Sequence, residues 1–201
     1  MAVKYFFEFT DLEGINHRVD IASDDFTGEA TEISGEVNFD YAENDGVLDY
    51  IKGNGLTIDI LADENINFLD LYSETDRFWK TTYTRNSIVL FNGFLKPDGL
   101  FQSFVQDRYI ISLDCVDGLS YLKDLSYVDS GGFPFVGNQS LLEIIVNCLK
   151  RTEISLNINI SLDFFYSGLA ETESVAENVF FDTQRFVKDD NDTIMNCDEV
   201  L

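Results

Sequence analysis

The chain has 201 residues, of which 45% are hydrophobic and which include 18 Phe and 9 Tyr, so it is long enough for one large domain or two small ones with a real core. Thirteen basic residues against 37 acidic ones leave a formal net charge of −24. Such a charge disfavours binding to the phosphates of nucleic acids and to an anionic membrane surface.

The cysteines and the apolar runs exclude several further classes of protein. Cys115, Cys148 and Cys197 are widely spaced and form no CxxC pair, so we expect buried small hydrophobic side chains and neither a secreted disulfide set nor a zinc site. No run of 18 apolar residues is long enough to span a membrane, and the apolar start is too short for a signal peptide. We therefore expect the chain to be made in a cytoplasm.

Residues 1–116 are predicted to form successive strands. Residues 5–10 and 15–22 are expected to form a hairpin around a turn that ends at Gly14. Residues 32–41 alternate apolar and polar side chains, which is typical of a half-buried antiparallel strand. Further strands are expected at residues 56–61, 77–85, 87–95, 101–106 and 109–115, with a hairpin turn at Asn86 and a short helical turn at residues 67–72.

After Asp117 and Gly118 the pattern changes to a smaller α+β part. Leu119, Leu122 and Leu125 predict a short helix, and the turn at residues 130–134 is the best boundary in the chain. Residues 141–151 predict a helix that begins with a capping box, Ser140 to Glu143. Its buried face is expected to hold Leu141, Leu142, Ile145 and Leu149. A strand is expected at residues 154–164, and residues 166–192 are expected to be an irregular acidic excursion.

The fold class we predict is mainly β, an antiparallel barrel or sandwich, with a smaller α+β C-terminal part. The β-rich domain is expected at residues 1–128 and the α+β segment at residues 133–201. Asn196 and Glu199 announce a further helix just before the last residue, Leu201. We therefore expect the α+β segment to be the start of a domain that continues beyond Leu201; a frayed natural end is the alternative.

A search for catalytic chemistry singles out no site. His17 is the one histidine and lies within an expected strand without a G-x-S-x-G motif, so we interpret it as a structural histidine paired with an acid. The acidic cluster at residues 189–192 does not fit an EF-hand loop, because Ile194 falls at its fifth position. Gly53 and Gly55 precede a strand and lack the rest of a phosphate-binding loop. We predict no catalytic, cofactor-binding or metal-binding residues, no cofactor, and no enzyme.

Two stretches of sequence resemble tail proteins of phages and prophages, of the baseplate-hub or tail-associated class. The first is F-N-G-F-L-K-P at residues 91–97, and the second is L-D-C-V-D-G-L-S-Y-L-K at residues 113–123. Residues 53–61 and 69–72, the helix with sequence S-L-L-E-I-I and the ending N-C-D-E-V-L add to the resemblance, which covers roughly residues 3–128. Asn92 and Gly93 let a strand bend, Pro97 to Gly99 are expected to turn it into the next strand, and Asp117 is placed to cap a helix.

The resemblance implies a structural component of the virion tail, synthesised in the cytoplasm of a bacterial host. It implies self-association into a ring, a trimer or a hexamer, that joins the tail tube to the host-facing tip and to other tail proteins. It implies neither specific nucleic-acid binding nor membrane binding, and an acidic ring wall would let DNA slide past. Two alternatives remain open: a carbohydrate-binding β-sandwich with exposed aromatic rings, and part of a tail-associated cell-wall hydrolase that uses a pair of carboxylates.

Overall fold

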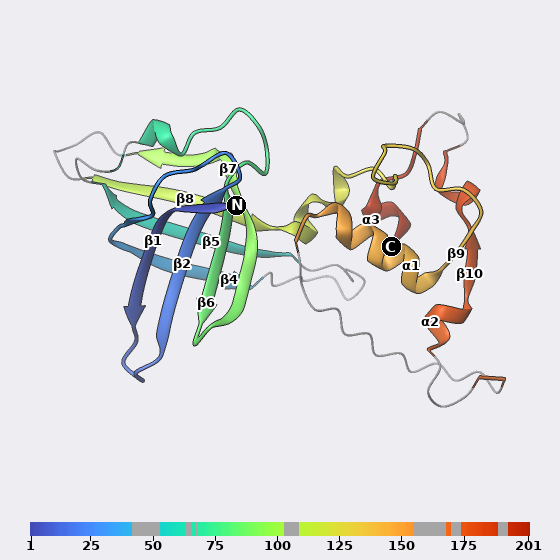
Figure 1. Cartoon of the computed structure of the whole chain (residues 1–201), viewed down its shortest axis with the longest axis horizontal. Coiled ribbons are helices and arrows are strands. Elements are labelled where there is room, and N and C mark those ends of the chain that lie inside the picture. The colour runs from blue at the N-terminus through green and yellow to red at the C-terminus, as the bar shows by residue number, and fades with distance from the viewer. Residues whose placement is uncertain are drawn as a thin grey trace. The chain divides into compact units, whose positions relative to one another are not determined.

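The computed structural model describes residues 1–41, 53–62, 66, 68–102, 109–154, 168–169, 174–188 and 193–201. It consists of two compact units, Met1–Ser120 and Tyr121–Leu201 (Figure 1). The turn at residues 130–134 lies inside the second unit, where the Asp129 carboxylate accepts hydrogen bonds from the backbone N–H groups of Gly131 and Phe133. No helix in the described part of the chain is long and apolar enough to cross a membrane.

The first unit is built on one eight-stranded sheet with the order β3-β1-β2-β6-β7-β8-β5-β4. The strands are β1 (Ala2–Thr10), β2 (Asn16–Ser23), β3 (Thr31–Glu32), β4 (Gly35–Tyr41), β5 (Asn54–Ala62), β6 (Lys80–Arg85), β7 (Ile88–Gln102) and β8 (Tyr109–Asp117). All neighbouring strands are antiparallel except β1 and β3, which are parallel. The prediction of a mainly β fold is confirmed.

The sheet is strongly bent but does not close into a barrel, so that part of the expected description is corrected. The strand expected at residues 32–41 is divided: its start pairs with β1, and from Gly35 onward it pairs with β5. The backbone N–H of Ile33 donates to Phe6, while the carbonyl of Ser34 accepts from Leu61. The edge strands β3 and β4 are therefore consecutive parts of one segment and cannot pair with each other.

Strand β7 carries the sheet around its other bend. It pairs with β6 from Ile88 to Phe94 and with β8 from Gly93 to Gln102. Its register against β8 shifts between Leu95 and Leu100, so Pro97 to Gly99 lie in a bulged part of one long strand and do not form the turn expected there. In Figure 1, β1, β2 and β6 run in one direction, and β8, β5 and β4 cross them.

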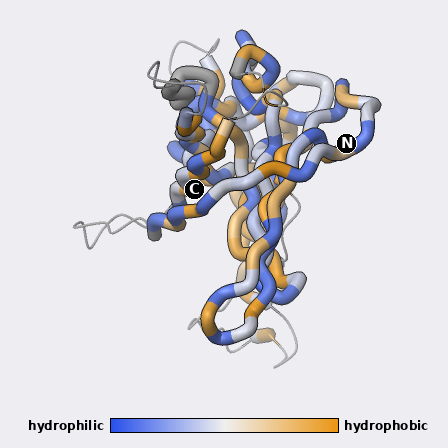
Figure 2. The backbone as a smooth tube through the Cα atoms, turned by 90° about the vertical axis from the view of Figure 1, so that its left-hand side faces the viewer, coloured by the Kyte–Doolittle hydropathy of each residue, from blue (hydrophilic) through white to orange (hydrophobic). Residues whose placement is uncertain are grey.

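A single hydrophobic core lies between the two halves of the bent sheet. Alternate side chains of every strand from β1 to β8 except the two-residue β3 point into it, and Figure 2 shows hydrophobic and hydrophilic segments interleaved along the strands. Val19, Ile58, Ile60, Ile111 and Leu113 are completely buried. The alternation that predicted half-buried strands is thus the alternation that fills the core.

The connections of the first unit agree with the turn residues in the sequence. Gly14 has a φ of +78° in the β1–β2 turn, and Asn86 and Ser87 have φ values of +47° and +64° between β6 and β7. A 3₁₀ turn, η1 (Phe68–Asp70), lies where a helical turn was expected, and η2 (Gly118–Lys123) follows β8. The side chain of Asp117 caps η2, because its carboxylate accepts the backbone N–H of Ser120 at 3.1 Å.

The second unit has mixed α and β structure. Its elements are β9 (Asn138–Ser140), α1 (Leu141–Arg151), α2 (Val175–Asn178), β10 (Phe180–Asp182), η3 (Thr183–Phe186) and α3 (Cys197–Val200). Strand β9 pairs antiparallel with β10. The capping box of α1 is confirmed: Ser140 accepts the N–H of Glu143 at 3.2 Å, and the Glu143 carboxylate accepts the N–H of Ser140 at 2.8 Å.

Two predictions for the second unit are wrong in detail. The fully buried positions of α1 are Ile144 and Cys148, whereas Leu141, Leu142, Ile145 and Leu149 are half-buried. The part of residues 166–192 that the structure describes contains α2, β10 and η3 instead of an irregular excursion, because β10 finds a partner in β9. The strand expected at residues 154–164 and the acidic cluster at residues 189–192 lie outside the described residues, apart from Ile154.

Candidate functional site

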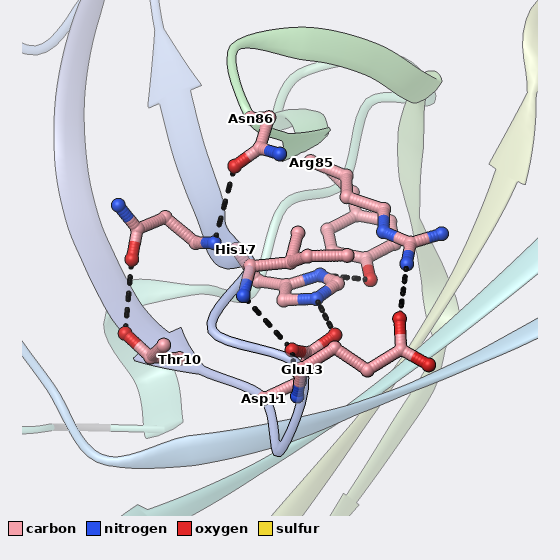
Figure 3. Close-up of polar contacts among 9 residues, drawn as sticks. Thr10, Asp11, Glu13, His17, Arg85 and Asn86 are labelled. Carbon is pink, nitrogen blue, oxygen red and sulfur yellow. Dashed lines mark hydrogen bonds and ion pairs between the residues drawn. The ribbon is translucent and has the colours of Figure 1, made fainter.

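The ends of two hairpins meet at one edge of the first unit (Figure 3). The backbone N–H of Asn86 donates to the carbonyl of Asn16 at 2.8 Å, and the N–H of Asn16 donates to the Asn86 side-chain oxygen at 3.3 Å. The hydroxyl of Thr10 donates to the side-chain oxygen of Asn16 at 2.9 Å. These bonds fix the β1–β2 turn against the β6–β7 turn.

His17 is the centre of this cluster and is only 8% exposed. Its Nδ1 lies 2.7 Å from the hydroxyl of Tyr83, and its Nε2 lies 3.1 Å from Oδ2 of Asp11. The ring stacks on Phe9, with 4.7 Å between ring centroids. Because both ring nitrogens are engaged and one face is covered, neither nitrogen is available to a substrate in this arrangement. The prediction of a structural histidine paired with an acid is confirmed.

Asp11 organises the β1–β2 turn through its carboxylate. The pKa of Asp11 is lowered, first by the hydrogen bond from the backbone N–H of Ile15 and then by the contact with His17 and the N–H of Glu13. The Glu13 carboxylate lies 3.6 Å from the guanidinium of Arg85, and both side chains are exposed. The turn is therefore held by a buried contact on one side and a solvent-exposed ion pair on the other.

A hollow of about 490 Å³ opens beside the cluster. Its lining is polar apart from Phe9 and includes Glu8, Thr10, Asn16, Arg18 and Thr84. Arg18 is held by the carboxylates of Glu8 and Asp20, and this ion pairing raises the pKa of its guanidinium. The hollow thus holds hydrogen-bonding groups that are already paired with one another, and no histidine nitrogen faces it unpaired.

The cysteines occupy the positions expected of small hydrophobic residues. All three thiols are free and buried. Burial raises the pKa of Cys115 to about 12 although its thiol donates to Thr81. The thiols of Cys148 and Cys197 are hydrogen-bonded to each other in the second unit, which raises the pKa of Cys148 and lowers that of Cys197. No group of three or more His, Cys, Asp or Glu suited to a metal ion occurs among the described residues.

The aromatic side chains of the first unit mostly pack inward. Among those the structure describes there, Tyr72 is the one large aromatic that is exposed, and in the second unit Phe133 and Phe180 are exposed. A row of coplanar exposed rings, which the carbohydrate-binding alternative requires, is therefore not formed by the described strands of the first unit.

The two stretches that resemble tail proteins lie side by side in the sheet. Gly93 is opposite Asp117, Phe94 opposite Val116 and Leu95 opposite Cys115. A Cβ atom on Gly93 would lie 2.1 Å from the carbonyl oxygen of Val116, so the close approach of β7 to β8 requires glycine there. The carboxylate of Asp117 also accepts the N–H of Asn54 at 2.6 Å, which joins the start of β5 to the end of β8.

Comparisons with known proteins give one structural likeness to report. No family model matches the chain, and no curated protein matches its sequence. Among solved structures, the chain is similar to a 43 kDa tail protein of prophage MuSo2 from Shewanella oneidensis, with a TM-score of 0.36 and 14% identity. The match covers 64% of this chain and 40% of the prophage protein. A likeness at this level does not by itself establish a shared fold or function.

Proposed function

We propose that this chain is a structural component of a phage or prophage tail, at the tail tip or baseplate hub. In this proposal, copies of the chain form a ring, a trimer or a hexamer, that joins the tail tube to the host-facing tip. The chain is made in the cytoplasm of the bacterial host and works in the virion. It needs no cofactor and carries out no catalysis of its own.

The observation that carries the proposal is the resemblance of residues 91–97 and 113–123 to tail proteins. These stretches pair as adjacent antiparallel strands, with Gly93 opposite Asp117, so they belong to one structural element. The roles of Gly93 and Asp117 there are architectural, as suits a protein whose work is mechanical. The net charge of −24 suits a ring wall along which DNA passes without binding.

The arrangement of His17 supports the absence of catalysis in the proposal. Both of its ring nitrogens are hydrogen-bonded and Phe9 covers the ring. General acid–base catalysis needs a ring nitrogen within hydrogen-bond reach of the substrate. A histidine in this position serves instead to hold the β1–β2 turn on the sheet.

Light scattering behind a sizing column, at near-physiological salt, tests the ring. Salt is needed because charges of one sign on every copy repel one another until they are screened. We expect a discrete trimer or hexamer, and negatively stained particles of that mass should be annular. A monomer across the full range of concentrations would contradict the ring.

A further inference from the structure

The positive charge of this chain is concentrated in one hairpin. Residues 77–97 contain four basic residues and no acidic one, in a chain with 37 acids. They comprise β6, the turn at Asn86 and Ser87, and the first part of β7. Two of the basic residues, Lys80 and Arg85, mark the ends of β6, and the Arg85 side chain is exposed. The β6–β7 hairpin is therefore a basic element on an acidic protein.

The tip of this hairpin is also apolar and uncovered. Ile88, Val89 and Leu90 are 67%, 45% and 37% exposed. Successive side chains of a strand point to opposite faces, so three consecutive exposed residues mean that both faces of the tip are open. Figure 1 shows the β6–β7 hairpin, in green, extending past the crossing strands β4 and β5. Exposed apolar side chains gathered in this way are typical of an interaction surface.

A surface of the opposite charge lies on the outer face of β4, β5 and β8. These strands contain no Lys or Arg. Their inward side chains fill the core, which leaves four carboxylates on the other face: Glu36, Asp40, Asp59 and Asp114. Leu61 and Ile110, which are cross-strand neighbours and exposed, add an apolar end to this acidic face.

The acidic face has an electrostatic cost within a single copy. Glu36 and Asp59 are directly opposite each other on β4 and β5, and like charges in that position destabilise a sheet. Asp59 accepts a hydrogen bond from the hydroxyl of Ser112, and Asp114 accepts one from Thr57 at 3.2 Å. These donors are neutral, so a cation from outside the three strands would remove a repulsion that they leave in place.

We propose that copies of this chain associate head to tail, with the β6–β7 hairpin of one copy on the acidic face of the next. The hairpin supplies basic side chains and an apolar tip, and the face supplies carboxylates beside Leu61 and Ile110. Two acidic faces repel each other, so the contact is between different surfaces of the two copies. Repetition of such a contact makes a ring when the rotation closes. This inference rests on the proposed function and names the surfaces that form the ring.

A charge-exchange experiment on the full chain tests the assignment by sedimentation velocity. The hairpin variant carries Lys80→Glu and Arg85→Glu, and the face variant carries Glu36→Lys and Asp114→Lys. The control carries Glu29→Lys and Glu74→Lys, which change the charge as much as the face variant does at exposed sites off these strands. Far-ultraviolet circular dichroism and the fluorescence of Trp79, which is buried, verify that each variant is folded.

We expect wild type and control to sediment as the oligomer and each interface variant to sediment as a monomer. An equimolar mixture of the hairpin and face variants should regain the oligomer, because acidic hairpins then meet basic faces and basic hairpins meet acidic faces. Ile88→Asp, an exposed change at the tip, gives a second test should a charge variant not fold; it too should yield monomers.

The failures of the two proposals are distinguishable. Oligomeric wild type together with oligomeric interface variants would overturn the surface assignment and leave the ring standing. Monomeric wild type at all concentrations would overturn both. A mixture of variants that stays monomeric would show that charge pairing between these two surfaces does not drive assembly, and it would also overturn the assignment.

Discussion

The substitution Gly93→Ala should destabilise the first unit severely, although it adds a single methyl group. Its Cβ would lie 2.1 Å from the carbonyl oxygen of Val116 and 2.7 Å from the ring of Phe91. The carbonyl belongs to the paired backbone of β8, so the strands must separate by roughly 1 Å to restore van der Waals contact. Overpacking of this kind costs about 1–3 kcal/mol and occasionally more. Because a backbone atom is struck, we expect about 3 kcal/mol.

Gly55→Ala is the matched control for this prediction. Gly55 is also a strand glycine, and it pairs with Val116 from the other side of β8. A Cβ there would meet nothing closer than 3.9 Å, the side chain of Asp40. The alanine fits, and it reduces the conformational freedom of the unfolded chain, which stabilises a protein by about 0.4–1 kcal/mol. The two substitutions should therefore change stability in opposite directions.

Urea unfolding monitored by Trp79 fluorescence measures the difference in the right unit. Trp79 is the one tryptophan of the chain and is 6% exposed in the core of the first unit. With a slope of about 1–3 kcal/mol per molar urea, a loss of 3 kcal/mol lowers the midpoint by roughly 1–3 M. Equal midpoints for Gly93→Ala and Gly55→Ala would refute the argument that β7 and β8 approach too closely for a side chain.

Three further predictions concern local interactions. Ser140→Ala removes one half of the α1 capping box and should cost about 1 kcal/mol, seen as faster hydrogen exchange in α1; unchanged exchange would contradict the cap. The folded-state pKa of Asp11 is lowered, so its contribution is present above the ordinary aspartate pKa and is lost as the pH falls through the lower folded value. The stability advantage of wild type over Asp11→Asn should accordingly shrink below about pH 4, and a constant difference would contradict this linkage. Cys115 should resist iodoacetamide at pH 8 in the folded chain, because burial raises its pKa to about 12; rapid alkylation without unfolding would contradict its burial.

Local signals in the sequence predicted the parts of the fold that local forces determine. Ser140 and Glu143 placed the start of α1 correctly, because a capping box needs only residues within one turn. Asn86 placed the β6–β7 turn, because few residues tolerate a positive φ. Asp117 was correctly expected to cap the turn after β8. His17 was correctly paired with an acid, although the sequence did not identify Asp11 or Tyr83 as its partners.

Features that depend on distant strands were not predicted. Pro97 and Gly99 are typical turn residues, yet β7 continues through them because β8 offers a second partner beyond the bulge. The division of residues 31–41 between β1 and β5 likewise depends on strands elsewhere in the chain. The acidic face brings Glu36, Asp59 and Asp114 together from three strands, and this grouping has no signature in the sequence.

Immunogold electron microscopy of phage particles from the cells that make this chain tests the central claim most directly. Antibodies raised against the purified chain, which should recognise its exposed loops, would be applied to intact particles and to particles stripped of their tails. The account predicts gold at the tail tip of intact particles and none on isolated heads. Gold absent from the particles, with the chain recovered only in the soluble fraction of the lysate, would contradict a structural role in the tail.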